Sequence, residues 1–132
     1  MIAVILVLVV VLSQTIKTAV HAFKHGFDIR ILTSDGGFPS THCALVTALT
    51  FIVYFEQGLS VLFFAVLVFS LLVVNDSVKV RRETGEEAKL LNILVRKEHI
   101  AGKKLSEHEG HSPAQAFAGI ILGFLITLLF YI

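Results

Sequence analysis

The stretch GGFPSTHCALVTALT, residues 36–50, places a polar cluster at the start of an apolar segment. Its two glycines permit a tight turn, and Pro39 is favoured in the first turn of a helix. The backbone N–H groups of about Ser40 to His42 then lack acceptors within the helix, so this helix end attracts anions. Ser40 and Thr41 add hydroxyl donors, and His42 is placed to donate a proton to a leaving oxygen. The same stretch also fits a capped helix start that binds no ligand.

The composition of the chain is that of an integral membrane protein. Of its 132 residues, 55% are hydrophobic and only 16% are charged. The mean hydropathy is +0.83, which is too apolar for a typical soluble domain. The length suits a single domain covering residues 1–132. The formal net charge of +1 gives no indication of nucleic-acid binding, and the single cysteine, Cys43, excludes an internal disulfide.

Four apolar segments approach the length of about 20 residues that crosses a hydrocarbon layer. The fold class predicted from them is all-α, an integral membrane helical bundle of about four transmembrane helices. The short link Glu56-Gln57-Gly58 makes the second and third spans an antiparallel hairpin. The expected spans cover residues 2–23, 39–55, 59–75 and 113–132.

A charged stretch separates the third and fourth spans. At its centre, apolar residues recur at helical spacing, so we expect an amphipathic segment at about residues 83–105. This segment would lie on the membrane surface or cap the bundle. A solvated helix that buries its apolar stripe on the protein fits the same pattern. The apolar residues are Leu90, Leu91, Leu94 and Val95.

The positive charges are confined to two of the three loops. All 11 Lys and Arg residues and all 6 histidines lie around the first loop or in the long third loop, whereas the second loop carries only Glu56. An even number of spans between them puts the first and third loops on one side, and the positive-inside rule makes that side cytoplasmic. We expect a bacterial plasma membrane, with every residue suited to acid–base or anion chemistry at its cytoplasmic face.

A second histidine opens the last span. His111 stands four residues before Gln115, and Gly119 and Gly123 follow at the same spacing, so we expect all of them on one helix face. The two glycines form a GxxxG pattern, which predicts the close approach of another helix or a homodimer contact. A histidine on such a packed face is often structural rather than catalytic.

Cations flank the spans at the same face. Lys17 lies near the end of the first span, and Arg30 follows in the loop. Asp76, Arg81 and Arg82 lie where the third span ends. Topology alone also requires flanking cations. However, a helix-end anion site, two histidines on different spans and several cations at one face together favour phosphate chemistry.

Three motifs, GGFPSTHCALVTALT, NDSVKVRRETGEEA and GHSPAQAFAGIILG, occur in this order along the chain, and with Lys17 they extend over residues 17–123. Together they resemble the divergent branch of the type-2 phosphatidic acid phosphatase superfamily, which is related to the vanadium-dependent haloperoxidases. The resemblance implies an all-helical membrane enzyme. Such an enzyme would hydrolyse a lipid phosphate monoester or pyrophosphate through a phosphohistidine, with no metal and no cofactor.

The resemblance also implies roles for individual residues. His111 would attack phosphorus, and His42 would protonate the leaving oxygen. Asp76 would orient an arginine that neutralises the phosphate. Gln115 or Glu109 would fix the imidazole tautomer of His111, where the superfamily has an aspartate. The phosphate-binding residues would be Lys17, Arg30, Ser40, Thr41 and either Arg81 or Arg82.

Two other functions fit the sequence. Because Gln115 replaces the usual aspartate and Thr41 the usual glycine, the alternative is a non-enzymatic membrane protein that binds or translocates anionic lipids. A structural subunit of a larger membrane complex would use the Gly119/Gly123 face and the amphipathic segment as contacts. The expected partners are a lipid phosphate substrate and membrane lipids, without nucleic acid, and a second copy at the Gly119/Gly123 face.

Overall fold

All regular elements are helical in the part of the chain that the structure, a computed structural model, describes: residues 1–25, 37–99, 102, 104–105, 107 and 110–132. A π-helical turn, η2 (Asp76–Val80), joins two of the α-helices. The predicted all-α membrane bundle is confirmed. The α-helices are α1 (Ile2–His25), α2 (Thr41–Gln57), α3 (Val61–Asn75), α4 (Arg81–Lys97) and α5 (Pro113–Leu129).

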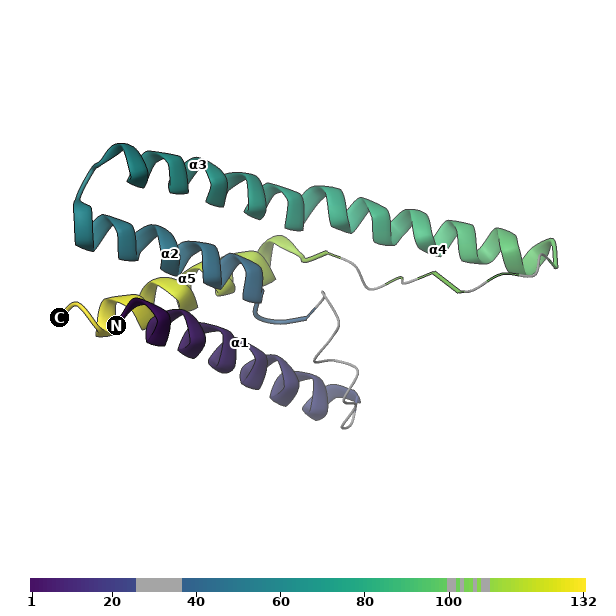
Figure 1. The fold of residues 1–132 in the computed structure, drawn as a ribbon. Helices are drawn as coiled ribbons and strands as arrows, with labels where there is room; N and C mark the ends of the chain where they lie inside the picture. Colours follow the sequence, from purple (N-terminus) through teal and green to yellow (C-terminus); the bar gives the residue numbers. More distant parts are fainter. Residues whose placement is uncertain (26–36, 100–101, 103, 106, 108–109) are drawn as a thin grey trace.

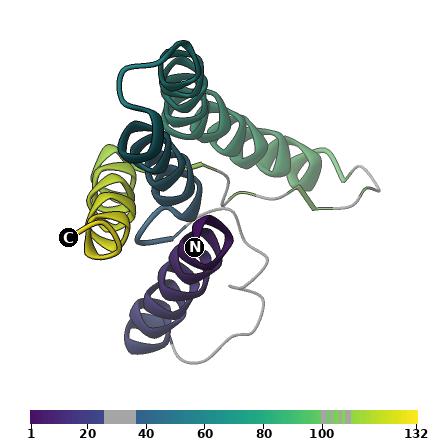
Figure 2. The same ribbon diagram turned by 60° about the vertical axis from the view of Figure 1, so that its left-hand side comes forward.

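The helices α1, α2, α3 and α5 run alternately in opposite directions along one bundle (Figure 1). The central helix is α2, which contacts α1, α3 and α5, and these three helices are arranged around it in Figure 2. Both chain termini lie at one end of the bundle (Figure 1). The end of α1, the starts of α2 and α5, and η2 consequently lie at the other end, as the expected four-span topology requires.

The lengths and surfaces of the helices suit a lipid environment. The stretches Ile2–Phe23 and Val61–Lys97 are long and apolar enough to cross a membrane. Each of α2 and α5 has 17 residues, about 25 Å at the rise of an α-helix, somewhat less than the hydrocarbon layer of about 30 Å. Ser70 is the only buried residue of α3, and most of the large apolar side chains of this helix are exposed. An apolar surface of this kind is typical of contact with lipid.

The start of α2 differs from the prediction by two residues. We expected Pro39 in the first helical turn, but α2 begins at Thr41. Ser40 takes the N-cap position, where its backbone is extended and its Oγ accepts the N–H of Cys43 at 3.3 Å. A capping serine satisfies a helix end better than proline does, which explains the boundary. At the other end of the bundle, α5 ends at Leu129 rather than at residue 132.

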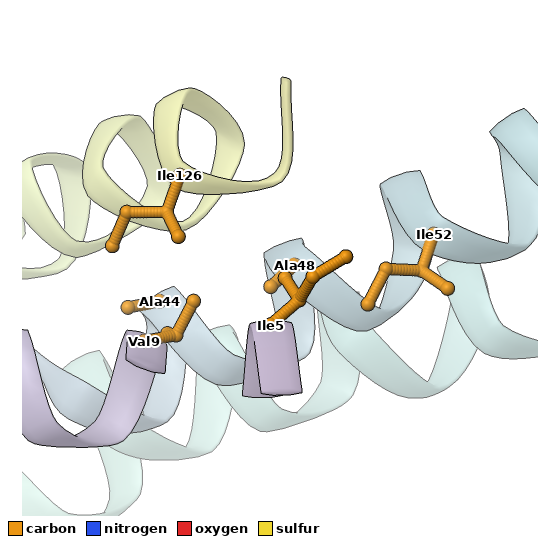
Figure 3. Packing of buried hydrophobic residues seen from close by; sticks show 6 residues of the cluster. All are labelled: Ile5, Val9, Ala44, Ala48, Ile52 and Ile126. Atoms are coloured by element: carbon orange, nitrogen blue, oxygen red, sulfur yellow. The ribbon is translucent and has the colours of Figure 1, made fainter. Parts of the chain in front are cut away.

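The apolar core lies between α1, α2 and α5 (Figure 3). Small alanines on α2 leave room there for larger side chains from α1 and α5. On α1 the buried stripe continues from Val9 to Ser13 and Lys17, which are 0% and 4% exposed. The interior therefore becomes polar toward the end of the bundle that carries the predicted site. The core residues are Ile5, Val9, Ala44, Ala48, Ile52 and Ile126.

The glycine pair of α5 packs inside the chain. A Cβ added at Gly119 would overlap the carbonyl oxygen of Ser40, and one at Gly123 would overlap that of Ala44. The GxxxG pattern thus allows α5 to approach α2, which is one of the two contacts that we expected from it. Within the chain, α2 therefore covers this glycine face. The homodimer contact through Gly119 and Gly123 stays a prediction.

The amphipathic segment is not separated from the third span. Residues Val61–Lys97 form one continuous helix in which η2 is the only departure from α-helical geometry. No glycine or proline occurs between residues 61 and 84 to break it. In Figure 1, α4 continues the line of α3 beyond the bundle and does not fold across its end. Within the predicted segment at residues 83–105, the helix α4 ends at Lys97.

One side chain ties the chain after α4 back to that helix. Asn92 donates to the carbonyl oxygen of Leu105 at 3.0 Å and to Glu107 at 2.7 Å, and it accepts the N–H of Leu105 at 2.9 Å. The buried residues of α4 are the small residues Gly85 and Ala88. Leu105 and Glu107 are thereby held beside α4 at Asn92.

Candidate functional site

The candidate site lies where α2 and α5 begin side by side. The backbone N–H of Ser40 donates to the carbonyl oxygen of Gln115 at 3.0 Å, which joins the cap of one helix to the first turn of the other. Gly119 keeps this approach close. Two helix N-termini, each the positive end of a helix dipole, therefore face the same region.

The two predicted catalytic histidines meet there. The ring centroids of His42 and His111 lie 6.3 Å apart, with the ring planes nearly perpendicular at 85°. His42 is in the first turn of α2 and is partly exposed, whereas His111 is only 3% exposed. His111 stands before the N-cap Ser112 and outside the helix. The expectation that it shares a helix face with Gln115 is therefore wrong.

The first turn of α2 retains part of the predicted anion site. The N–H of Ser40 is used by Gln115, and that of Cys43 is used by the hydroxyl of Ser40. The N–H groups of Thr41 and His42 have no acceptor among the described residues. Two of the backbone donors that we expected thus stay available to a ligand, while Ser40 serves mainly as the helix cap.

The polar part of α1 approaches the start of α2. Ser13 donates to the hydroxyl oxygen of Thr41 at 3.2 Å. Lys17, one turn further on, is buried. Its side chain packs against Gly37, which precedes α2: a Cβ added at Gly37 would lie only 2.8 Å from the Lys17 Cε. A buried ammonium is costly unless it has anionic or polar partners. The position of Lys17 fits the predicted phosphate-binding role.

Two more polar residues extend this face of α1. Gln14 and Thr18, one turn apart, have a buried Oε1 and a buried Oγ1 without a hydrogen-bond partner in the described part of the chain. We did not predict either of them, although their four-residue spacing beside Lys17 is a signal that the sequence carries. They widen the polar lining of α1 near the site.

The adjacent arginines have different partners. The Nε of Arg81 lies 2.9 Å from Oδ2 of Asp76, across the π-helical turn. The Nε of Arg82 lies 3.4 Å from Oε1 of Glu86, and the Arg82 side chain is 53% exposed. Asp76 thus contacts Arg81, as an orienting carboxylate would. Arg82 instead forms a surface pair within α4.

Ser77, a residue that we did not predict, connects η2 to His111 and to Cys43, the neighbour of His42. The carbonyl oxygen of Ser77 accepts the backbone N–H of His111 at 2.9 Å. Its hydroxyl lies 3.6 Å from the sulfur of Cys43, the neighbour of His42, and both side chains are buried. Nothing in the spacing of Ser77 marks this role, because it depends on a π-helical turn that the sequence pattern does not reveal.

Comparison with known proteins gives the family. The model of a family described as the divergent PAP2 family matches residues 1–126. The chain belongs to this family. It is similar to the uncharacterized membrane protein YuiD of Bacillus subtilis (strain 168), with 35% identity over 136 residues that cover 90% of this chain and 86% of YuiD. No solved structure matches the chain significantly. The resemblance to a divergent branch of the superfamily is confirmed.

One orienting role predicted for this divergent PAP2 protein is wrong. We expected the Gln115 side chain to accept the imidazole N–H of His111. The Gln115 Oε1 instead accepts the backbone N–H of Ser112 at 2.7 Å, and the backbone N–H of Gln115 donates to the Ser112 hydroxyl at 3.3 Å. This reciprocal capping box uses the amide to begin α5. The predicted residues Arg30 and Glu109 lie outside the described residues.

The described side chains do not suggest a metal site. In the ranges that the structure covers, no three His, Cys, Asp or Glu side chains are grouped so that they could hold a metal ion. The region around the two histidines instead combines imidazoles, backbone N–H donors, a buried lysine and an oriented arginine. Such a set can bind an oxyanion and exchange a proton with it.

Proposed function

We propose that this member of the divergent PAP2 family is a membrane phosphatase that hydrolyses a lipid phosphate monoester or pyrophosphate through a phosphohistidine intermediate, without a metal ion. The observation that carries the proposal is the pair of His42 and His111, whose ring centroids lie 6.3 Å apart. Membership of the divergent PAP2 family supports the same class of reaction.

The reaction would proceed in two displacements. A ring nitrogen of His111 attacks phosphorus, the bond to the leaving oxygen breaks, and His42 gives its proton to that oxygen. Water then attacks the phosphohistidine, its proton passes to His42, and the phosphorus–nitrogen bond breaks to release inorganic phosphate. Attack requires an approach of about 3 to 3.5 Å, and proton transfer requires about 2.6 to 3.2 Å. A phosphoryl group bound between the two rings would have to meet both requirements.

Charge on the transferred group would be balanced by groups from three elements. Lys17 contributes an ammonium group from α1, and Arg81, held by Asp76, contributes a guanidinium group from the start of α4. The N–H groups of Thr41 and His42 add donors at the positive end of α2. Preorganised donors and cations of this kind stabilise the charge that develops on phosphoryl oxygens.

The substrate class follows from the position of the site in the bundle. The site lies at one end of helices whose outer surfaces are apolar (Figure 1), so it would open at the depth of lipid headgroups. A phosphate there can reach the histidines while its acyl or polyprenyl chains stay in the hydrocarbon layer. We place this face on the cytoplasmic side of a bacterial plasma membrane, in accord with the distribution of Lys and Arg.

A phosphate-release assay tests the proposal. The purified protein, with EDTA present, is given phosphatidate, phosphatidylglycerophosphate, polyprenyl phosphate and polyprenyl pyrophosphate in mixed micelles. We expect release from at least one lipid, inhibition by vanadate, and no release by His111→Ala. His42→Ala should lower kcat about 10²- to 10⁴-fold, the usual range for a lost general acid. The loss should be much smaller for p-nitrophenyl phosphate, because its leaving group needs little protonation.

A matched histidine variant controls this experiment. His99 is exposed beyond the end of α4, so His99→Ala should keep full activity. Release that survives in His111→Ala, or that requires an added metal ion, contradicts the proposal. If His42→Ala lowers kcat equally for the lipid phosphate and for p-nitrophenyl phosphate, His42 is not the proton donor.

A second function is favoured by one observation. The Gln115 side chain forms the capping box of α5. In enzymes whose catalytic histidine is hydrogen-bonded to a carboxylate, that carboxylate contributes strongly to catalysis. A protein that binds or translocates an anionic lipid would need the same donors and cations but no covalent step. It would bind vanadate or a lipid phosphate without releasing phosphate, and His111→Ala would leave that binding intact.

A further inference from the structure

The junction between α3 and α4 has an altered hydrogen-bond pattern. In η2 the backbone N–H of Arg81 donates to the carbonyl oxygen of Asp76, five residues earlier. An α-helix would instead direct this N–H to Ser77, four residues earlier. The π-helical turn therefore leaves the Ser77 carbonyl without its usual partner from Arg81. Single π-helical turns inside long helices are frequent at functional sites.

The Ser77 carbonyl is used by the candidate nucleophile. It accepts the backbone N–H of His111 at 2.9 Å, so η2 holds the residue directly before the N-cap of α5. The Ser77 hydroxyl lies 3.6 Å from the sulfur of Cys43 on α2, next to His42. Ser77 thus contacts His111 itself and the residue after His42, and it is 2% exposed.

Gly110 permits the approach of His111 to η2. Its φ of +80° is in the region that favours glycine. A Cβ at this position would overlap the backbone N of Arg82 and come within 2.8 Å of the carbonyl carbon of Arg81. The chain therefore passes directly against the helix backbone just before His111. No larger residue fits here without moving His111.

We propose that η2 is the positioning element that sets His111 against His42, and that Ser77 and Gly110 are its positioning residues. The turn supplies the carbonyl that fixes His111, and Gly110 lets the chain reach it. In the context of catalysis the inference rests on the proposed phosphatase function. The positioning itself is a matter of distance and can be measured in a protein that has no turnover. Precise placement by supporting contacts is what a two-residue catalytic pair requires.

The experiment measures the distance between positions 42 and 111 by chemical crosslinking. The full-length parent protein carries His42→Cys, His111→Cys and Cys43→Ser, so that the native thiol does not react. Dibromobimane, which fluoresces only when it joins two nearby thiols, reports their proximity. The test variant also lacks Val80, whose side chain is exposed. Removing one residue converts a π-helical turn to an α-helix and returns the Ser77 carbonyl to the helix.

We expect efficient crosslinking in the parent and at least a tenfold lower yield after deletion of Val80. The matched control is Ser70→Ala in the parent. Ser70 is another buried serine on the same helix, bonded to Thr50 at 2.8 Å and remote from the histidines. Its loss should lower thermal stability but leave the crosslinking yield unchanged. Circular dichroism and gel filtration compare the folding of all variants.

Each outcome decides the inference. A parent that does not crosslink, or a yield that is unchanged by the deletion, overturns it. If the deletion variant fails to fold, Gly110→Ala in the parent takes its place, and an unchanged yield there also overturns it. If the native protein releases no phosphate although crosslinking depends on η2, the positioning inference stands and the proposed function fails. If phosphate is released and crosslinking is independent of η2, the proposed function stands and the positioning inference fails.

Discussion

Arg81 and Arg82 are neighbours in the chain but have unlike surroundings. Asp76 contacts the Arg81 guanidinium at 2.9 Å, whereas Arg82 pairs with Glu86 on the exposed side of α4. A guanidinium that is held by a carboxylate loses less freedom when it binds phosphate. A pair between exposed groups such as Arg82 and Glu86 adds little to stability.

This difference predicts unequal effects of two matched substitutions. Arg81→Gln should weaken vanadate binding about 10- to 100-fold, the range of a hydrogen bond to a charged group, while Arg82→Gln should change it less than about threefold. Isothermal titration with vanadate measures both. Equal effects, or a larger effect at Arg82, would contradict the assignment of Arg81 to the phosphate.

The roles of residues could be predicted from the sequence where they depend on the chemistry of the side chain and its place at a helix end. The sequence indicated that His42, His111, Lys17 and Asp76 belong to one end of the bundle, because chemistry-bearing residues at helix ends gather there. It did not indicate the roles of Gln115 and Ser77. Those roles depend on which backbone group each residue contacts. The contacts arise from a capping box and a π-helical turn, which are recognised only in the folded structure.

At the scale of elements, α2 and α5 form the most extensive helix–helix contact among the described residues. The glycines of α5 lie against the backbone of α2 at Ser40 and Ala44. The same contact joins the caps of the two helices through the bond from Ser40 N–H to the Gln115 carbonyl. Stability and the geometry of the histidine pair are therefore linked at this interface.

Alanine at either glycine should separate the two helices. Gly119→Ala and Gly123→Ala each force a Cβ into an α2 carbonyl, and overpacking of this kind costs about 1 to 3 kcal/mol. Thermal unfolding in detergent measures the change. Gly102→Ala is the control, because nothing lies within 4 Å of a Cβ added there. Unchanged stability of Gly119→Ala and Gly123→Ala would argue against this packing.

The elements themselves were predictable to different degrees. The spans could be located because long apolar segments leave few alternatives to transmembrane helices. The continuity of α3, η2 and α4 was missed, since the charges from Lys79 onward indicate where the membrane ends but not where the helix ends. The first helical residue of α2 was displaced from Pro39 to Thr41 because the cap at Ser40 determines the boundary.

At the scale of the whole molecule, the bundle is polarised along its axis. The termini and the turn between α2 and α3 lie at one end, and the starts of α2 and α5, the end of α3 and the protruding α4 lie at the other (Figure 1). The Lys and Arg residues that the structure describes belong to the second half of α1 or to the chain from η2 to the start of α5, toward the second end, whereas Glu56 is the charged residue next to the turn at the first. Such an asymmetry fixes orientation in a membrane.

Cysteine accessibility tests this orientation. In a Cys43→Ser background, Gln57→Cys lies at the end of α2, beside the turn at the first end, and Gly102→Cys lies beyond α4. Both positions are exposed. In intact bacterial cells, a membrane-impermeant maleimide should label Gln57→Cys. It should label Gly102→Cys only after the cells are permeabilised. The opposite pattern would place the site on the outer face.

The measurement that tests the central claim most directly is the trapping of the covalent intermediate. The purified protein is mixed with a ³²P-labelled lipid phosphate, quenched within milliseconds, and digested for mass spectrometry. The predicted result is a phosphoryl group on His111 that survives alkali, is lost in acid, and is absent from His111→Ala. Turnover without any label on His111, or the same label in His111→Ala, would contradict the claim that the two histidines hold one phosphoryl group between them.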